Sequence, residues 1–246
     1  MKLHEVKTIT PADLTPVRGA VNPWSHQDMI PRGAKPIKQV NSGKEDDDGE
    51  SSGLWASTYA TPDEPGTAHK IIRSAVNLKS DAYFKYVSAL AKNDRITSNP
   101  YFPKIYNVTV KQDEKGLSRY AVEMEALLDF STLSVEEMQM LGDRMFFNFE
   151  PMLKHYRARM TELGVKDAKL TDHKTLQFAL LKALENLFTY NTKAITYIKD
   201  PKLKAAMLIL SSLVKKDRVA PDIHDGNLMI RRGPGGPQIV ITDPVT

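Results

Sequence analysis

The stretch APDIHDGNLMIRRGPGGPQIVITDP, residues 220–244, combines acidic and turn-forming residues with two short apolar runs. NLMIRR and QIVITDP have the pattern of strands, and the turn GPGGP between them predicts a hairpin. Asp222 precedes the first strand, Asn227 begins it, and Asp243 lies at the end of the second. A hairpin can hold such short oxygen ligands rigidly, as a hard cation such as Mg²⁺ requires. The alternative is an ordinary turn, because Pro, Asp, Gly and Asn are frequent turn formers.

Upstream of this stretch, the sequence predicts a β-rich part followed by a helical part. LWASTYA and AHKIIRSAV predict one hairpin, and IYNVTVKQ and LSRYAVEMEAL predict a second. SDAYFKYVSALAK between them predicts a helix of about three turns behind a Ser80/Asp81 cap. We therefore expect an α+β fold with a flexible N-terminal extension and acidic loop at residues 1–50, a β-rich lobe at 51–128 and a mainly helical lobe at 129–246.

Three longer stretches predict the helices of the second lobe. STLSVEEMQMLGDRMFFNFEPMLKHYRARMTEL begins with a Ser/Thr cap followed by glutamates, and Pro151 is expected to kink the helix that it predicts. TLQFALLKALENLFTYNTKAITYI predicts a further helix. PKLKAAMLILSSLVKK predicts another, with proline in its first turn.

Composition narrows the class of protein. The 246 residues are 41% hydrophobic and 26% charged, and no apolar stretch approaches the ~20 residues that span a bilayer. The start MKLHEVKTIT lacks the apolar core of a signal peptide, and zero cysteines exclude disulfides and thiolate metal sites. The net charge of +4 is mild and the lysines are scattered, which argues against nucleic-acid binding. We expect a cytoplasmic protein without a membrane partner.

The spacing in the C-terminal stretch resembles the catalytic segment of the protein-kinase-like fold. In that segment an aspartate, four intervening residues and an asparagine precede a hairpin that ends in a metal-binding aspartate. Asp222, Asn227 and Asp243 reproduce this order. His224 and Gly226 strengthen the resemblance, since H-x-G-N recurs in kinase-like phosphotransferases.

DIHDGNLM and ITDPV are most similar to the early-gene serine/threonine protein kinases of podovirus-type bacteriophages, in which proline likewise follows the metal aspartate. The resemblance covers about residues 50–246. It implies a two-lobe fold with a small β-rich N-lobe and a mainly helical C-lobe, truncated after the metal-binding aspartate. The sequence stops at Thr246, three residues past Asp243, so it does not indicate the substrate.

ATP and Mg²⁺ are the cofactors that the resemblance implies. Asp222 would orient the attacking hydroxyl or accept its proton, while Asn227 and Asp243 would hold Mg²⁺ on the phosphates. Lys70, in the predicted strand AHKIIR, would neutralise the α- and β-phosphates. Arg73 is the rival cation on this strand. We favour Lys70, because a compact ammonium suits a pair of phosphate oxygens better than a guanidinium does.

Two further expectations concern the phosphate loop and the helix acid. Gly53 and Ser57 in SSGLWASTY would let backbone amides approach phosphate, and the alternative is an ordinary strand start. The family pairs its strand lysine with a helix glutamate, yet Ile71 to Gln112 contains no glutamate. Asp81 is the acid near the expected place, and a helix cap is its alternative role.

The hinge is expected in RYAVEMEALLDF, where a strand leads into the helical lobe. By resemblance, Met124 would lie at the back of the adenine pocket. The backbone of Glu125 and Leu127 would offer hydrogen bonds to the adenine.

Three functions remain open. The first is an ATP-dependent serine/threonine kinase that phosphorylates itself or host proteins, such as transcription and RNA-processing machinery, in the host bacterial cytoplasm. The second is a small-molecule phosphotransferase, which would need an acidic pocket built by helices after the metal aspartate. The third is a catalytically silent kinase-like module that binds and inhibits a host protein.

Overall fold

The computed structural model of the chain describes residues 29–33, 35–36, 56–60, 66–72, 76–93, 96, 98–112, 116–162, 173–189 and 194–245. These residues form two compact units. The first comprises those within Met1–Ser98 and Phe102–Leu127, and the second those within Asn99–Tyr101 and Leu128–Thr246. The first unit contains a large sheet and the second contains several helices with a smaller sheet, so the expected α+β class is confirmed.

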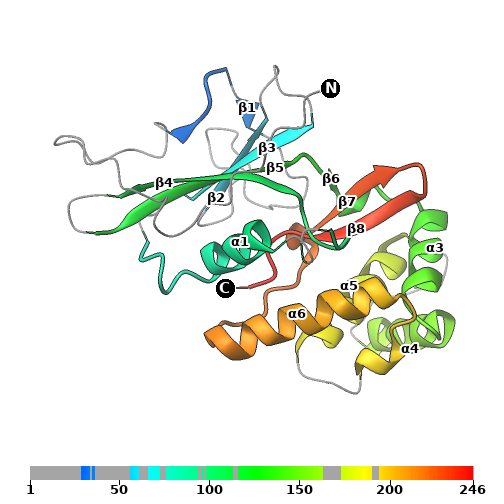
Figure 1. The fold of residues 1–246 in the computed structure, drawn as a ribbon. Helices are drawn as coiled ribbons and strands as arrows, with labels where there is room; N and C mark the ends of the chain where they lie inside the picture. Colours follow the sequence, from blue (N-terminus) through cyan, green and yellow to red (C-terminus); the bar gives the residue numbers. More distant parts are fainter. Residues whose placement is uncertain are drawn as a thin grey trace. The chain divides into compact units, whose positions relative to one another are not determined.

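The first unit is built on a five-stranded antiparallel sheet in the order β1-β2-β3-β5-β4 (Figure 1). Its strands are β1 (Lys35–Pro36), β2 (Ala56–Ala60), β3 (Thr67–Ile72), β4 (Ile105–Gln112) and β5 (Ser118–Glu125). The β2–β3 and β4–β5 pairings confirm both predicted hairpins. Strand β1 falls within residues 1–50, where a flexible extension was expected, and most of that range lies outside the described residues.

Helix α1 (Ala82–Lys92) confirms the predicted helix and its cap. The Asp81 carboxylate accepts a hydrogen bond from the Phe84 N–H at 2.6 Å, which satisfies one of the amides that the first turn leaves unpaired. The buried side chains of α1 recur at helical spacing and are Tyr83, Tyr86, Val87 and Leu90. They form the apolar face of the helix.

The second unit contains the three-stranded sheet β6-β7-β8, with β6 (Leu128–Asp129), β7 (Leu228–Gly233) and β8 (Gly236–Ile241). Antiparallel pairing of β7 with β8 confirms the C-terminal hairpin. The strands reach Gly233 and Gly236, so the turn is shorter than the GPGGP expected from sequence. Gly236 adopts φ +87°, a conformation that glycine enters without the steric cost of a Cβ atom.

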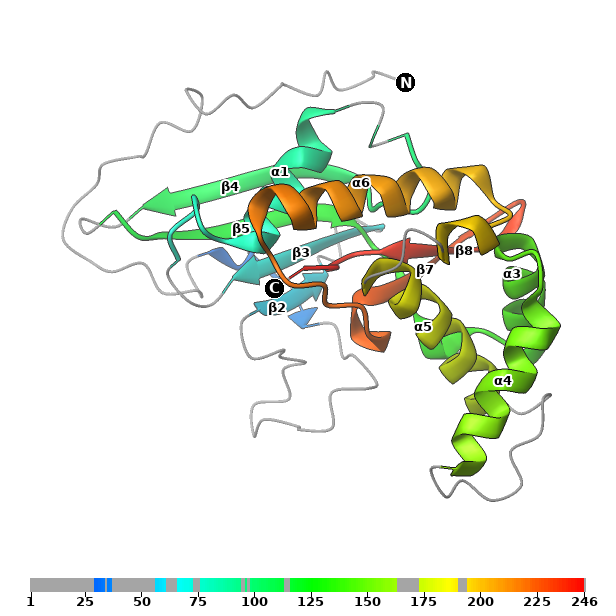
Figure 2. The same cartoon turned by 90° about the horizontal axis from the view of Figure 1, so that it is seen from below.

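The helices of the second unit are α3 (Val135–Met145), α4 (Phe149–Glu162), α5 (His173–Thr189) and α6 (Pro201–Asp217). Figure 2 shows α5 beside α3 and α4, with which it is in contact. The short 3₁₀ helices of this unit are η2 (Phe130–Thr132), η3 (Ala194–Tyr197) and η4 (Asp225–Asn227). Proline lies in the first turn of α6, as predicted. The capping box of Ser134 and Glu137 confirms the predicted start of α3.

The single helix expected from residue 131 onward, with a kink at Pro151, is wrong. The chain leaves the helical conformation at Phe146 (φ −124°, ψ 145°), where it forms an isolated bridge with Ile198. Pro151 instead lies in the first turn of α4, where its missing N–H would have no helical partner. The helix predicted through residue 198 likewise ends at Thr189, and its last part forms η3.

A short segment, Asn99–Tyr101, joins the second unit although the chain on either side belongs to the first. The Tyr101 carbonyl accepts a hydrogen bond from the Ile241 N–H at 2.8 Å, at the end of β8. The Tyr101 hydroxyl donates to Asp200 at 2.7 Å. Burial and this carboxylate together raise the pKa of Tyr101 well above its usual range. Tyr101 therefore stays neutral and serves as a structural link.

None of the helices in the described part of the chain combines the length and apolar character needed to cross a membrane.

Candidate active site

The loop from Asp222 to Asn227 is closed by the Asn227 side chain. Its Nδ2 donates to the Asp222 carbonyl at 2.9 Å and to the Asp222 carboxylate at 3.2 Å. The Asn227 N–H also donates to the His224 carbonyl at 3.0 Å within η4. Asn227 is 8% exposed, so these bonds form in a largely desolvated place. The predicted pair of an aspartate and an asparagine five positions apart is thus in direct contact.

Backbone hydrogen bonds bring Asp243 to the same loop. The Thr242 N–H donates to the Asn227 carbonyl at 2.9 Å, and the Pro244 carbonyl accepts from the Asp222 N–H at 2.7 Å. Asp243 is the residue between these two anchor points and is half-buried. The structure therefore brings Asp222, Asn227 and Asp243 together through the backbone.

His224 and Gly226 shape this loop. The Gly226 N–H donates to Nδ1 of His224 at 3.1 Å. The other ring nitrogen of His224, Nε2, lies 3.8 Å from the Asp222 carboxylate. A Cβ atom on residue 226 would lie 2.9 Å from the imidazole, so glycine lets the ring pack on the loop.

The donor set fits a hard cation. The hydrogen bonds that the Asn227 side chain makes within the described residues come from Nδ2, so its amide oxygen is directed away from Asp222. That oxygen and the carboxylate of Asp243 are the ligand types that Mg²⁺ accepts, with water and phosphate oxygens completing the shell. Asn227 and Asp243 are the residues that could hold such an ion, and their role as metal ligands stays a prediction.

In the first unit, Lys70 lies on β3 between Thr58 of β2 and Val122 of β5. It is half-buried, and its Nζ lies 4.1 Å from the centroid of the Tyr83 ring on α1. Ser57 lies on β2, paired with Ile71, and its side chain is outside the described part. The predictions for Gly53 and Arg73 lie outside the described residues.

Asp81 takes the alternative role that the sequence left open. Besides capping α1, its Oδ1 accepts a hydrogen bond from the Tyr120 hydroxyl at 2.6 Å. The carboxylate thus links the start of α1 to strand β5. Pairing of Asp81 with Lys70 stays a prediction.

The expected hinge residues lie at the end of β5. Met124 is buried, between Ala68 of β3 and Ile105 of β4. The Glu125 N–H donates to the Lys104 carbonyl at 3.0 Å, and its carboxylate accepts from the Lys104 N–H at 2.8 Å. A backbone hydrogen bond between Glu125 and an adenine would therefore have to be accepted by the Glu125 carbonyl.

Leu127 is half-buried and follows Ala126, whose N–H donates to the Gly66 carbonyl at 2.7 Å. The chain just before Leu127 is therefore fixed to the turn between β2 and β3. The expected role of the Leu127 backbone toward an adenine stays a prediction.

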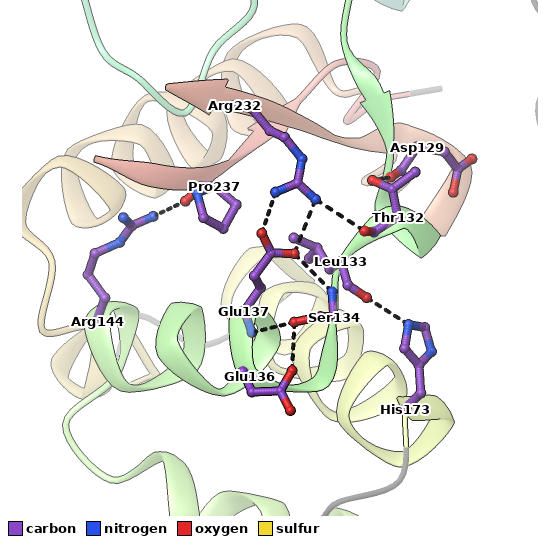
Figure 3. A network of polar contacts seen from close by, with 10 residues as sticks. All are labelled: Asp129, Thr132, Leu133, Ser134, Glu136, Glu137, Arg144, His173, Arg232 and Pro237. Atoms are coloured by element: carbon purple, nitrogen blue, oxygen red, sulfur yellow. Dashed lines mark hydrogen bonds and ion pairs between the residues drawn. The ribbon is translucent and has the colours of Figure 1, made fainter. Parts of the chain in front are cut away.

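A polar network joins helix α3 to the hairpin that carries the site (Figure 3). The Arg232 guanidinium, on β7, binds both carboxylate oxygens of Glu137 and donates to the Thr132 carbonyl at 3.2 Å. Arg144, in the last turn of α3, donates to the Pro237 carbonyl on β8 at 2.8 Å. Helix α3 thus holds both strands at the end of the hairpin nearest its turn.

Glu137 is ionised in this network. The pKa of the Glu137 carboxyl is held below its usual range. The main cause is its hydrogen bonding with Arg232, followed by the hydrogen bond that it accepts from the Ser134 N–H. The same bonding raises the pKa of Arg232.

Sequence reasoning missed the partners of the site residues. Thr242 donates to the Asn227 carbonyl from both its N–H and its hydroxyl, and Tyr83 contacts Lys70. The stretch SDAYFKYVSALAK places Tyr83 on the predicted helix, but helical spacing does not indicate which strand residue Tyr83 meets. Thr242 had a usable signal, since it directly precedes Asp243.

No protein-family model matches the chain, and the search of curated proteins finds no similar sequence. The functional assignment therefore rests on the residues themselves.

Proposed function

We propose that this protein is an ATP-dependent serine/threonine protein kinase with a protein-kinase-like two-lobe fold, which phosphorylates host proteins and itself. The observation that carries the proposal is the hydrogen bond from Nδ2 of Asn227 to Asp222, on a loop that also anchors the residues flanking Asp243. It orients a carboxylate and an amide oxygen in fixed and different directions. Such an arrangement suits a reaction that needs a base and a cation site side by side.

In the proposed reaction, the hydroxyl oxygen of the substrate attacks the γ-phosphorus of ATP. The bond from this phosphorus to the β–γ bridging oxygen breaks, ADP leaves, and the hydroxyl proton passes to Asp222. Mg²⁺, when bound, would neutralise the charge that develops on the phosphate oxygens. Asn227 and Asp243 would hold that ion, and Lys70 would bind phosphate oxygens. Most of the rate enhancement would come from positioning and charge neutralisation.

The proposed site of action is the cytoplasm of a bacterial host. By family resemblance, the substrates are proteins of its transcription or RNA-processing machinery. No membrane partner is proposed.

The test is incubation of the protein with γ-labelled ATP, Mg²⁺ and a host lysate. Label on proteins, lost in Asp222→Asn, is the expected result. Label on a small molecule would point to the second function, and complete absence of label would exclude phosphoryl transfer.

The third function, the catalytically silent module, is the alternative that a specific contact favours. By resemblance, Asp81 is the acid expected to pair with the strand lysine. Its carboxylate instead accepts hydrogen bonds from the Phe84 N–H, as the cap of α1, and from the Tyr120 hydroxyl, which favours this candidate. Absence of label, together with capture of one host protein by both wild type and Asp222→Asn, would support this candidate.

A further inference from the structure

The contact between Lys70 and helix α1 is made with an aromatic ring. Nζ of Lys70 lies 4.1 Å from the centroid of the Tyr83 ring. Lys70 is half-buried and Tyr83 is 7% exposed, so the contact is largely shielded from water. An ammonium at this distance over a ring face is attracted by the negative charge of the π system.

The Tyr83 ring also contacts a ring of strand β5. It stacks on Tyr120 of β5 with a centroid distance of 6.4 Å and an interplanar angle of 25°. The Tyr120 hydroxyl donates to Asp81 at 2.6 Å, and Asp81 caps the helix that carries Tyr83. A continuous series of contacts thus runs from the start of α1 through two rings to Lys70. These contacts limit the movement of the Tyr83 ring and of the Lys70 ammonium that lies over it.

We propose that Tyr83 is a positioning residue for Lys70, and that it holds the strand ammonium by a cation–π contact. The inference rests on the proposed function, which assigns Lys70 to phosphate binding. It deepens that function by naming the helix residue that contacts the strand lysine. Residues 71–112 contain no glutamate that could take this place. A neutral ring orients the ammonium without an added negative charge, so the positive charge remains available to phosphate oxygens.

Two substitutions of Tyr83 test whether the face of its ring, rather than its hydroxyl or its volume, holds Lys70. Tyr83→Phe keeps the π face, whereas Tyr83→Leu removes it and keeps an apolar side chain. Tyr86→Leu is the control for loss of a buried ring from the same helix, because Tyr86 is 1% exposed and packs on Phe102 at a centroid distance of 6.2 Å. Its ring also lies 6.3 Å from that of Tyr83, so this variant removes a neighbour of Tyr83 but keeps the ring that Lys70 contacts. Thermal melts establish that all three variants are folded. The two leucine variants are then compared at temperatures that lie the same number of degrees below their respective melting temperatures.

The first measurement needs no activity. Lysines are reductively methylated with ¹³C, which preserves their charge, and the Lys70 resonance is assigned by its absence in Lys70→Arg. A ring-current shift to high field is expected in wild type, Tyr83→Phe and Tyr86→Leu, and its loss is expected in Tyr83→Leu. Absence of the shift in wild type, or its persistence in Tyr83→Leu, would overturn the proposed contact.

The second measurement is the Kd for magnesium-ATP by calorimetry. We expect Kd to rise about tenfold in Tyr83→Leu and to stay within about twofold of wild type in Tyr83→Phe and Tyr86→Leu. Equal binding by wild type and Tyr83→Leu would overturn the positioning role alone. Weaker binding by Tyr83→Leu than by wild type, with no phosphoryl transfer by wild type, would instead contradict the proposed kinase activity and support the positioning role. Failure of wild type to bind the nucleotide would overturn both.

Discussion

At the scale of single residues, Asn227 is the centre of the candidate site. Its amide hydrogens engage Asp222, and its carbonyl receives two hydrogen bonds from Thr242, next to Asp243. A leucine of similar size would keep the backbone carbonyl but would leave the Asp222 carbonyl and carboxylate without the amide donor, at a cost of roughly 1–3 kcal/mol for an acceptor that stays buried. The identity of this residue therefore matters for the fold of the loop as well as for a cation.

The first prediction concerns Asp243. Asp243→Asn keeps the shape of the side chain and removes its charge, so we expect phosphoryl transfer to fall on the order of 1,000-fold with the fold intact. Transfer of label from γ-labelled ATP measures activity, and circular dichroism measures folding. Asp143→Asn, on an exposed position of α3, is the control for the same chemical change. Normal turnover in folded Asp243→Asn would remove the kinase interpretation.

The second prediction decides between the two cations of the β3 region. Lys70→Met should reduce phosphoryl transfer about 100-fold, because an ammonium on phosphate oxygens stabilises charge in the transition state. Arg73→Met should reduce it far less. Both variants are compared with wild type at saturating and at limiting ATP. The reverse order of effects would assign the phosphate-binding role to Arg73.

At the scale of elements, the break between α3 and α4 depends on one glycine. A Cβ atom on Gly142 would lie 2.0 Å from a ring carbon of Phe149, and both residues are buried. The absence of that atom lets the first residue of α4 pack on the last turns of α3. The chain can therefore reverse at Phe146, where it pairs with Ile198.

The third prediction follows from this contact. Gly142→Ala should destabilise the protein by about 1–3 kcal/mol through overpacking, despite the roughly 1 kcal/mol that alanine gains in helix propensity. Urea unfolding measures the free-energy difference. The double variant Gly142→Ala/Phe149→Leu should be more stable than the sum of the two single changes predicts. Strict additivity would show that the ring and the glycine do not interact.

The fourth prediction concerns the link between α3 and the hairpin. Arg232 and the Ser134 N–H lower the pKa of Glu137, so the ionised carboxylate is favoured in the folded state. The resulting stability is present above the pKa of the unfolded chain, about 4.3, and is lost as pH falls through the lower pKa of the folded state.

Glu137→Gln should therefore lower the melting temperature at pH 7 by about 2 °C, and this difference should shrink as the pH falls below about 4. Melting curves of both proteins from pH 7 to pH 3 measure it. Glu150→Gln, which removes an exposed pair with Lys154, should change the melting temperature little at pH 7. A difference between wild type and Glu137→Gln that does not vary with pH would show that the charge of Glu137 is not what stabilises the link.

At the scale of the whole molecule, the residues assigned to nucleotide, metal and base occur in both compact units. Lys70 belongs to the first, and Asp222, Asn227 and Asp243 belong to the second. A ligand that binds the folded chain and not the unfolded chain must stabilise it.

The fifth prediction is thermal stabilisation by magnesium-ATP. At a concentration about 100 times Kd, the ligand should add about 2.7 kcal/mol to the free energy of unfolding. Calorimetric melts with ATP and Mg²⁺ together, and with each alone, measure the effect. Asp243→Asn is the comparison that isolates the metal contribution. A melting temperature indifferent to saturating ATP and Mg²⁺ would favour the silent module.

The sequence by itself determined the local structure of this protein. Alternating strands around Gly-containing turns predicted three hairpins, and the Asp81 and Ser134 caps predicted the starts of two helices. The spacing of Asp222, Asn227 and Asp243 predicted residues that the fold brings together. These features were readable because turn formation, capping and strand pairing across a short turn depend on residues close in sequence.

Only the tertiary structure decided the long-range contacts. Ile198 meets Phe146 and ends α3, Tyr101 binds β8, and Arg232 reaches Glu137 across 95 positions of sequence. The contact of Lys70 with Tyr83 belongs to the same class, because helical periodicity shows that Tyr83 is buried but not which strand side chain it meets. Such contacts depend on how elements pack against one another, and packing is set by the shapes of side chains that are distant along the chain.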